Sequence, residues 1–272
     1  MSSQSDSKNV ESTLQHEAIH ESWENRYRTV QNEKFYDLAF DEIVRILKPR
    51  DNSTLLDAGC GPCNYTIRLA KSGKFNITAA DISESALKLA EQKLRSNDLH
   101  RIINLRQENI TALSFPDESF DYVLCWGVLM HIPDIEKAIS ELSRVLKKGG
   151  LLVISEVNMH SFQCRAVTTL KQLLRKNNNV TAVITDAGIE YWQETSGGKL
   201  VTRHTNNAWL INKFKSHGLG LKKHMAGQFS EFYTMVSTQM LISLVHAFNY
   251  YWFKYVKSPH LACCNLFIFE RK

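Results

Sequence analysis

The sequence predicts an α/β fold built on a doubly wound, mostly parallel sheet of seven strands. Short apolar runs alternate with helical segments between residues 54 and 157, and two more strand-like runs follow at 219–224 and 264–271. Strands that alternate with helices of this length form βαβ units with right-handed crossovers. The chain has 272 residues, of which 43% are hydrophobic, so it can bury a core of this size.

The order of elements follows from the apolar runs and the residues that interrupt them. We expect five strands at 54–59, 76–81, 101–107, 120–128 and 151–157, with helices at 64–73, 84–97, 134–150 and 206–218. Pro62 lies where the first helix can start, and Ser83 can cap the second. Two glycines are expected to end helix 134–150. The second helix has one apolar stripe, formed by Ala86, Leu89, Ala90 and Leu94.

The remaining parts of the chain divide into a tail, a cap and two insertions. Residues 1–21 are polar and predict a disordered tail before a single domain at 22–272. Residues 22–50 predict an N-terminal helical cap. Residues 158–204, which include an amphipathic stretch at 166–176, and residues 230–260 break the alternation and are expected on the substrate side.

Residues 232–253 contain no Asp, Glu, Lys or Arg, and 22 such residues are long enough to cross a membrane. Polar residues dilute the segment, which favours a buried or interfacial helix and no stable span. A cluster of aromatic residues near its end suggests an inserted helical lid over an apolar or aromatic acceptor, although a helix packed on the sheet explains them equally well. These residues are Phe248, Tyr250, Tyr251, Trp252 and Phe253.

Charge and cysteine usage limit the partners and the compartment. A formal net charge of +5 without a run of Lys or Arg gives no indication of nucleic-acid binding. Six cysteines are spread through apolar segments, unlike the dense pattern of a secreted disulfide scaffold. The N-terminus lacks the layout of a signal peptide. We therefore expect a cytoplasmic protein with a small-molecule partner and no metal site.

A glycine turn follows the first strand, and an acid ends the second. Gly59 and Gly61 permit close approach of the backbone to a ligand, and Asp81 lies about 20 residues further on, where an acid can bind ribose hydroxyls. The turn also reads Cys60-Gly61-Pro62-Cys63, the pattern of a redox dithiol. Its place inside a strand-to-helix turn favours the ligand loop over the dithiol.

Four stretches, in order, resemble class I S-adenosylmethionine-dependent methyltransferases. They are the D-x-G-x-G pattern that begins at Asp57, "AADISESAL", "ENITALSFPDESFDYVLCWGVLMHIPD" and "ELSRVLKKGGLLVISE". The resemblance implies a Rossmann-like sheet, S-adenosyl-L-methionine as the cofactor, and methyl transfer to a small organic acceptor, with oxygen favoured as the acceptor atom.

The resemblance also implies roles for individual residues. Asp81 would bind the ribose, Asp57 the methionine end, and Asn109 the adenine amino group, although Asn109 can equally cap a turn. The implied cofactor-binding residues are Asp57, Gly59, Cys60, Gly61, Asp81, Ile82, Asn109, Ile110, Cys125, Trp126 and Tyr27.

Two residues are candidates for catalysis. His131 is expected near the transferred methyl group, as a general base or as a packed side chain, and Glu156 can orient a hydroxyl or act as the base. Tyr191 and His204 are weaker candidates. Because an activated methyl donor carries the difficult chemistry, an enzyme of this kind needs few catalytic groups.

Three other functions remain open at this point. The first is a membrane-associated enzyme that methylates a lipid or quinone, as the uncharged segment suggests. The second is a protein that binds the cofactor without catalysis. The third is an oxidoreductase that uses Cys60 and Cys63.

Overall fold

Seven strands form one sheet in the order β3-β2-β1-β4-β5-β10-β9, which confirms the predicted sheet. The computed structural model describes residues 4–166, 180–195 and 197–272. β10 is antiparallel to both of its neighbours, and the other pairs are parallel. The strand order reverses between β1 and β4, where sheets of this type bind ligands at the carboxyl ends of the strands. The strands are β1 (Ser53–Ala58), β2 (Phe75–Asp81), β3 (Ile103–Gln107), β4 (Phe120–Trp126), β5 (Leu146–Val157), β9 (Leu219–Ala226) and β10 (Cys264–Arg271).

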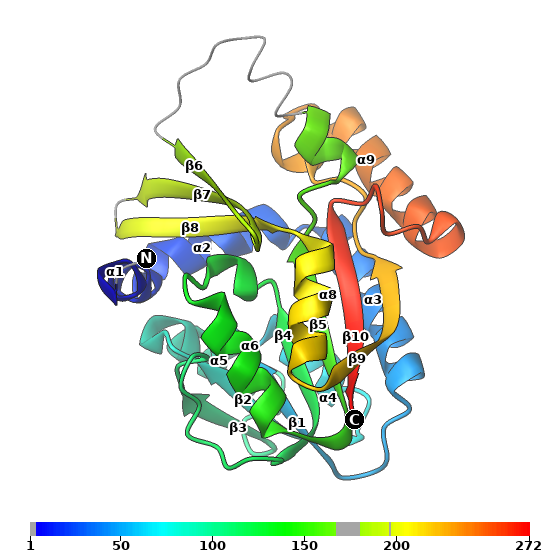
Figure 1. Cartoon of the computed structure of the whole chain (residues 1–272). Coiled ribbons are helices and arrows are strands. Elements are labelled where there is room, and N and C mark those ends of the chain that lie inside the picture. Colours follow the sequence, from blue (N-terminus) through cyan, green and yellow to red (C-terminus); the bar gives the residue numbers. More distant parts are fainter. Residues whose placement is uncertain (1–3, 167–179, 196) are drawn as a thin grey trace.

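Helices cover both faces of this sheet (Figure 1). α3 (Val30–Leu47), α4 (Asn64–Ala70) and α5 (Glu84–Ser96) contribute to one apolar cluster, together with alternate side chains of the strands. α6 (Ile135–Val145) and α8 (Asn207–Ser216) contribute to the cluster on the opposite face. The two-sided core explains why the strands read as nearly continuous apolar runs.

Short sequence motifs correctly predicted the start of α5 but not the end of α6. The hydroxyl of Ser83 accepts a hydrogen bond from the Ala86 amide and caps α5, as predicted. α4 starts at Asn64, as predicted, after a left-handed Cys63, and it ends at Ala70, three residues before the predicted end. The predicted end of α6 at two glycines was wrong, because β5 begins directly at Leu146. A Cβ on Gly150 would lie 2.8 Å from the Asp121 carbonyl oxygen, so close strand packing requires that glycine.

The N-terminal tail prediction was also wrong. Residues 1–21 include α1 (Gln4–Leu14) and the first part of α2 (Glu17–Tyr27). Val10 packs with Leu200 and Val201, which lie almost 200 residues later, so no local pattern marks this helix as ordered. The predicted cap at 22–50 is divided between α2 and α3, where Thr29 accepts a hydrogen bond from the Asn32 amide.

The first insertion contains a second, antiparallel sheet that the sequence did not predict. Its strands are β6 (Val180–Thr185), β7 (Gly188–Thr195) and β8 (Gly198–Thr205). This sheet lies beside α1 and α2 (Figure 1). Most of the expected amphipathic stretch, residues 167–176, lies outside the described residues.

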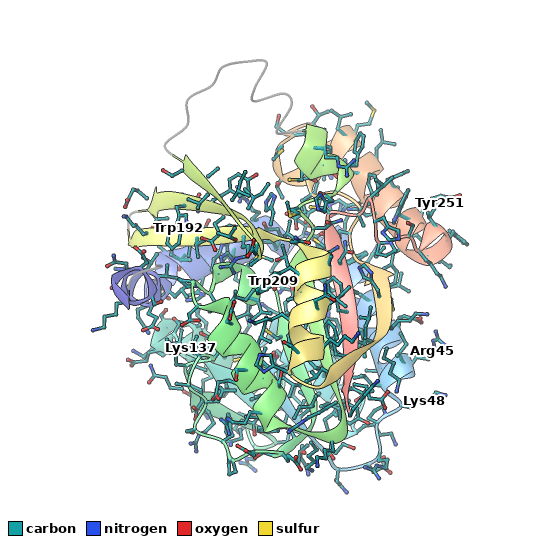
Figure 2. The ribbon with its side chains drawn as sticks, viewed as in Figure 1. Arg45, Lys48, Lys137, Trp192, Trp209 and Tyr251 are labelled. Atoms are coloured by element: carbon teal, nitrogen blue, oxygen red, sulfur yellow. The ribbon has the colours of Figure 1, made fainter. Side chains whose placement is uncertain are left out.

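The second insertion is helical, as predicted. The short turn η2 (Phe232–Thr234), α9 (Gln239–Tyr251) and the π-helical turn η3 (Trp252–Val256) connect β9 to β10. Tyr251 lies at the outer edge of the molecule (Figure 2). Within the described ranges, we find no helix with the length and apolar character needed to cross a membrane.

Candidate cofactor and acceptor site

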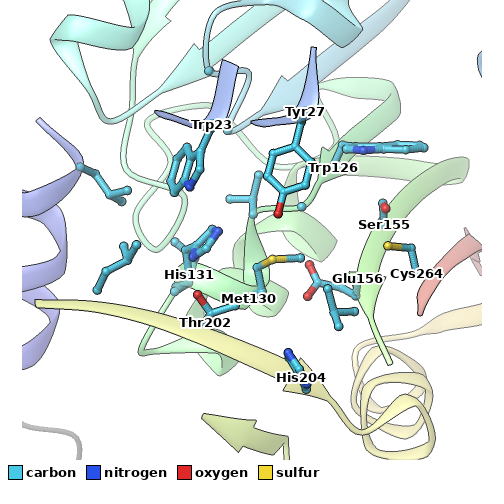
Figure 3. Close-up of a pocket in the computed structure, with 18 of the residues that line it drawn as sticks. Trp23, Tyr27, Trp126, Met130, His131, Ser155, Glu156, Thr202, His204 and Cys264 are labelled. Carbon is cyan, nitrogen blue, oxygen red and sulfur yellow. The ribbon is translucent and has the colours of Figure 1, made fainter. Parts of the chain in front are cut away.

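A cavity of about 1040 Å³ lies at the carboxyl ends of β1, β2, β4 and β5 (Figure 3). The N-terminal helices and the sheet β6-β7-β8 form its other walls. Small-molecule sites usually measure about 300–1,000 Å³, so this cavity has room for a cofactor and an acceptor together.

The glycine turn forms one wall of the cavity. Gly59 has φ +82°, and a Cβ there would lie 2.4 Å from Cγ2 of Val128. Gly61 has φ +50°, and a Cβ there would meet nothing within 4 Å, because it would occupy the cavity itself. Such a cradle, in which bare backbone faces open space, fits a ligand that lies against the loop.

Asp81 holds this turn at the end of β2. Its Oδ2 accepts a hydrogen bond from the Gly61 amide at 2.8 Å, and its Oδ1 accepts one from the Ser83 amide at 2.9 Å. Burial raises the pKa of this carboxyl group. Each carboxylate oxygen can accept a second hydrogen bond, so the group remains able to bind a pair of ribose hydroxyls.

The predicted role of Asn109 is weakened by its contacts. Its Oδ1 accepts hydrogen bonds from the Thr111 amide and hydroxyl at 2.9 and 2.8 Å, so the alternative of a turn-capping asparagine is the observed one. Its Nδ2 donates to Glu11 on α1 at 2.9 Å. Ile82 and Ile110 line the cavity nearby, where a flat apolar ring would fit.

Two predicted cofactor residues lie outside the cavity wall. Asp57 is buried beneath the loop, where its Oδ2 accepts a hydrogen bond from the Thr66 hydroxyl at 2.6 Å. Burial raises the pKa of Asp57 to about 7. Cys125 packs in the apolar cluster with α6. Neither side chain lines the cavity, so neither is placed for direct contact with a ligand there; the role of Asp57 at the methionine end through water stays a prediction.

The two cysteines of the loop do not have the environment of a redox pair. Cys60 and Cys63 are buried free thiols. The pKa of the Cys60 thiol is raised, first by its interaction with the Cys63 thiol, then by burial and by nearby carboxylates. Reactive dithiols need an accessible thiol with a lowered pKa, so the geometry disfavours the oxidoreductase hypothesis. Cys63 has φ +62°, a left-handed backbone conformation that glycine adopts more readily than cysteine.

His131 lies at the acceptor end of the cavity, on the short turn η1 (Leu129–His131). Its Nδ1 lies 2.8 Å from the Val201 carbonyl oxygen on β8. Its ring stacks on Trp23 of α2, with ring centroids 5.0 Å apart (Figure 3). Burial lowers the pKa of His131, so the imidazole is neutral near pH 7.

Glu156 faces the same cavity from the end of β5 (Figure 3). The side chain is 1% exposed, and its Oε2 accepts a hydrogen bond from the Thr205 hydroxyl at 3.2 Å. Its Oε1 makes no hydrogen bond of ordinary geometry with the described residues, and the nearby backbone amides of Leu129 and Met130 act only to lower the pKa of the carboxyl group. Burial raises the pKa of Glu156 to about 8. A buried acid with an unused oxygen is able to bind a polar atom of a ligand.

Arg203 is a residue that sequence reasoning missed. Its guanidinium is fully buried, pairs with Glu190 at 2.7 Å, and donates to the carbonyl oxygens of Leu129 and Ile132 at 2.9 and 3.0 Å. The inserted sheet is thereby fixed to the turn that carries His131. No local motif marks Arg203, because its main-chain partners lie about 70 residues earlier and its ion-pair partner Glu190 lies on the neighbouring strand.

Other cavity-lining residues also come from segments whose role was not predicted. Tyr27 and Trp126 line the cavity as expected, and Trp23 and Glu11 join them from the N-terminal helices.

The aromatic residues predicted as a lid, Phe248 to Phe253, are not among the lining residues. The inserted sheet covers that side instead, with Tyr191, Thr202 and His204, of which Tyr191 and His204 were weaker predictions.

The comparisons with known proteins agree with this geometry. Residues 56–154 match the family model of a methyltransferase domain. The chain carries a class I S-adenosylmethionine-dependent methyltransferase domain. A demethylmenaquinone methyltransferase of Listeria welshimeri is 34% identical over 113 residues, which are 41% of this chain and 48% of that protein. The one from Geobacillus stearothermophilus is 36% identical over 121 residues, 43% of this chain and 50% of that protein.

The whole chain also resembles solved structures along most of its length. The S-adenosylmethionine-dependent methyltransferase from Clostridium acetobutylicum has a TM-score of 0.60 at 17% identity, and the match covers 93% of this chain and 98% of that one. This likeness concerns the fold. The chain spans only about half the length of the curated relatives it matches, and both insertions and the N-terminal helices lie outside the matched methyltransferase model.

Proposed function

We propose that the protein methylates an apolar acceptor that carries an ionisable hydroxyl on an aromatic ring, with S-adenosylmethionine as the donor. The observation that carries the proposal is the unpartnered Oε1 of buried Glu156 in the same cavity as His131. The curated relatives are named demethylmenaquinone methyltransferases, so a reduced quinone is the specific candidate for the acceptor.

The residues around the glycine turn fit the cofactor. Asp81 would accept hydrogen bonds from the ribose, Gly61 would lie against the ligand, and Ile82 and Ile110 would contact the adenine. The bound sulfonium would supply an activated methyl group, which is the chemistry that the chain itself lacks.

His131 has the geometry of the general base. A carbonyl oxygen can only accept, so the contact with Val201 places the proton on Nδ1 and leaves Nε2 with a free lone pair. Nε2 would take the proton of the acceptor hydroxyl, whose electron pair remains on the oxygen and is shared with the ring. Either this oxygen or a ring carbon beside it would then take the methyl group, whose bonding electron pair would stay on the donor sulfur as a neutral thioether. Attack by carbon would also release the proton of that ring carbon to solvent, so the proposal covers both acceptor atoms.

Glu156 would bind the acceptor oxygen. With a pKa of about 8, its carboxyl group is mostly protonated near pH 7 and can donate a hydrogen bond from Oε1. A neutral hydrogen-bond donor at this position would stabilise the negative charge that develops on the acceptor oxygen, whereas a carboxylate would repel that charge. The apolar walls and the inserted sheet exclude water from the reaction.

The experiment combines binding with turnover. Calorimetric titration with S-adenosylmethionine is done on the wild-type protein, on Asp81→Asn, and on Asp41→Asn as an exposed control. Methyl transfer is then measured by mass spectrometry with 1,4-dihydroxynaphthalene, kept reduced, and with a naphthylamine. We expect binding that Asp81→Asn weakens at least tenfold, and methylation of the hydroxylated ring. Absence of binding would refute the methyltransferase proposal, and methylation of the amine alone would refute the proposed acceptor class.

A further inference from the structure

α9 has its apolar side turned outward. Met240, Leu244 and Tyr251 are 67%, 59% and 52% exposed, whereas the buried residues of this helix are His246 and Asn249. Asn249 is held inside by hydrogen bonds with both the amide and the carbonyl of Ser230, at 2.9 and 2.8 Å. A helix packed for stability alone has the opposite arrangement, with its apolar stripe inward.

The exposed residues form one continuous stripe. At 100° per residue, five exposed residues of α9 fall within an arc of about 100° on one side of the helix: Met240, Leu241, Leu244, Phe248 and Tyr251. The exposed Tyr255 of η3 follows, and its ring packs against that of Tyr251 with centroids 5.3 Å apart. Tyr251 projects from the outer edge of the molecule (Figure 2). A contiguous apolar surface of this kind usually marks a site of interaction.

The formal charges within the segment that carries the stripe are all positive. Residues 232–269 contain Lys254 and Lys257 and no Asp or Glu. Lys254 lies over the rings of Tyr250 and Tyr255, 5.4 Å from each centroid, so this cation stands at the border of the apolar stripe. Among acids on other elements, Glu42 of α3 acts on this region through Lys257, and Glu42 is itself paired with Arg45.

We propose that α9 and η3 form a docking surface for a membrane that contains anionic lipids. An interfacial helix combines an apolar face, aromatic residues and flanking lysines, and lies in the plane of the headgroups. The lysines provide the charge complementarity with anionic headgroups that a second copy of this chain would not offer, because the same surface repels itself. The docking does not depend on the proposed methyl transfer.

The surface leads toward the mouth of the cavity. Met235 is 60% exposed, lines the cavity and lies five residues before Met240. Ile184 of β6 is also exposed and lines the cavity. A membrane bound to α9 would therefore lie beside the entrance, so an apolar acceptor could enter without crossing water. This last step alone rests on the proposed function.

The test is co-sedimentation of the full chain with vesicles of phosphatidylcholine and with vesicles that also contain phosphatidylglycerol. We expect binding to the anionic vesicles that weakens with added salt. Lys254→Gln/Lys257→Gln should weaken this binding roughly fivefold for each charge removed, and Met240→Gln/Leu244→Gln should weaken it at least as much. The matched controls Lys71→Gln and Val30→Gln, both at exposed positions elsewhere, should leave it unchanged.

Two parallel measurements keep the outcomes separate. Calorimetric binding of S-adenosylmethionine should be equal in all variants, which shows that the domain is intact and separates this proposal from the proposed function. Failure of the wild-type protein to bind either vesicle, or equal binding by the α9 variants, would refute the docking surface. A dimer in sedimentation velocity that Met240→Gln/Leu244→Gln dissociates would assign the stripe to a second copy and also refute it.

Discussion

The Nδ1 atom of His131 lies 2.8 Å from the carbonyl oxygen of Val201, a residue 70 positions later in the chain. This one contact selects the tautomer of the imidazole, because only a protonated Nδ1 can donate to a carbonyl. The matched methyltransferase model ends at residue 154. Val201, which sets the tautomer of His131, therefore belongs to the first insertion and not to the matched region.

We expect His131→Asn to lower kcat by about 10²–10⁴, the usual contribution of a general base. Asparagine retains a donor for the Val201 carbonyl but offers no base, so the affinity for S-adenosylmethionine and the melting temperature should change little. Steady-state kinetics and calorimetry check this. His217→Asn, on the C-terminal side of α8, is the control, and an unchanged kcat in His131→Asn would assign His131 to packing.

We expect activity to depend on pH through two groups. It should fall below pH 6.5, as His131 with its lowered pKa becomes protonated, and again above about pH 8, as Glu156 loses the proton that it donates. Glu156→Gln keeps a neutral donor and cannot ionise. The pH profile of kcat for this variant should therefore lack the alkaline limb, and a limb that persists in Glu156→Gln would exclude Glu156 as its source.

Glu156 should also make stability depend on pH. Its pKa is about 8 in the folded protein and 4.5 in an unfolded chain, so between these values only the unfolded state releases the proton. The free energy of unfolding should thus fall by up to about 1.4 kcal/mol per pH unit in this range, relative to Glu156→Gln. Urea titrations of both proteins at pH 5 and pH 8 measure the difference. An equal change in the two proteins would contradict the buried, neutral carboxyl group.

Arg203→Met should lower the free energy of unfolding by about 3–5 kcal/mol, because it leaves the Glu190 carboxylate without its buried partner. Adding Glu190→Gln should restore part of the stability. It should not restore kcat, because the carbonyls of Leu129 and Ile132 remain without their donor and the turn that carries His131 is released. Arg45→Met, at an exposed pair, should change stability by less than about 1 kcal/mol.

The two loop glycines should respond differently to alanine. Gly59→Ala forces a Cβ against Val128 and should destabilise the fold by about 1–3 kcal/mol, and Val128→Ala should relieve part of this. Gly61→Ala meets no protein atom, so it should weaken S-adenosylmethionine binding more than it lowers the melting temperature. Equal effects of Gly61→Ala on both quantities would argue against a cofactor at this turn.

The parts that could be predicted from sequence are those whose signals are local. Strand-helix alternation, the cap at Ser83 and the spacing from Gly61 to Asp81 all operate within about 20 residues, and all are present in the structure. Asp57 and Cys125 show the limit of this approach. Their positions at strand ends were correctly placed, but sequence does not reveal which side of the strand faces the cavity.

The parts that escaped prediction depend on partners far along the chain. α1 reads as a polar tail because the surface that buries Val10 is supplied by β8. The same applies to Arg203, which joins the inserted sheet to the turn of His131 through main-chain carbonyls that have no sequence signature. The aromatic residues of the second insertion were interpreted from composition alone, as a lid or equally as a packed helix, whereas no residue of α9 lines the cavity.

α1 contacts both ends of the cavity at once. Glu11 accepts a hydrogen bond from Asn109, which follows β3, and two residues later the hydroxyl of Thr13 donates to the Lys199 carbonyl of β8. The helix α1 (Gln4–Leu14) thus joins the main sheet to the inserted sheet on two sides of the cavity. Under the proposed function, displacement of α1 would open the donor and acceptor regions together, so exchange of one ligand would loosen the enclosure of the other.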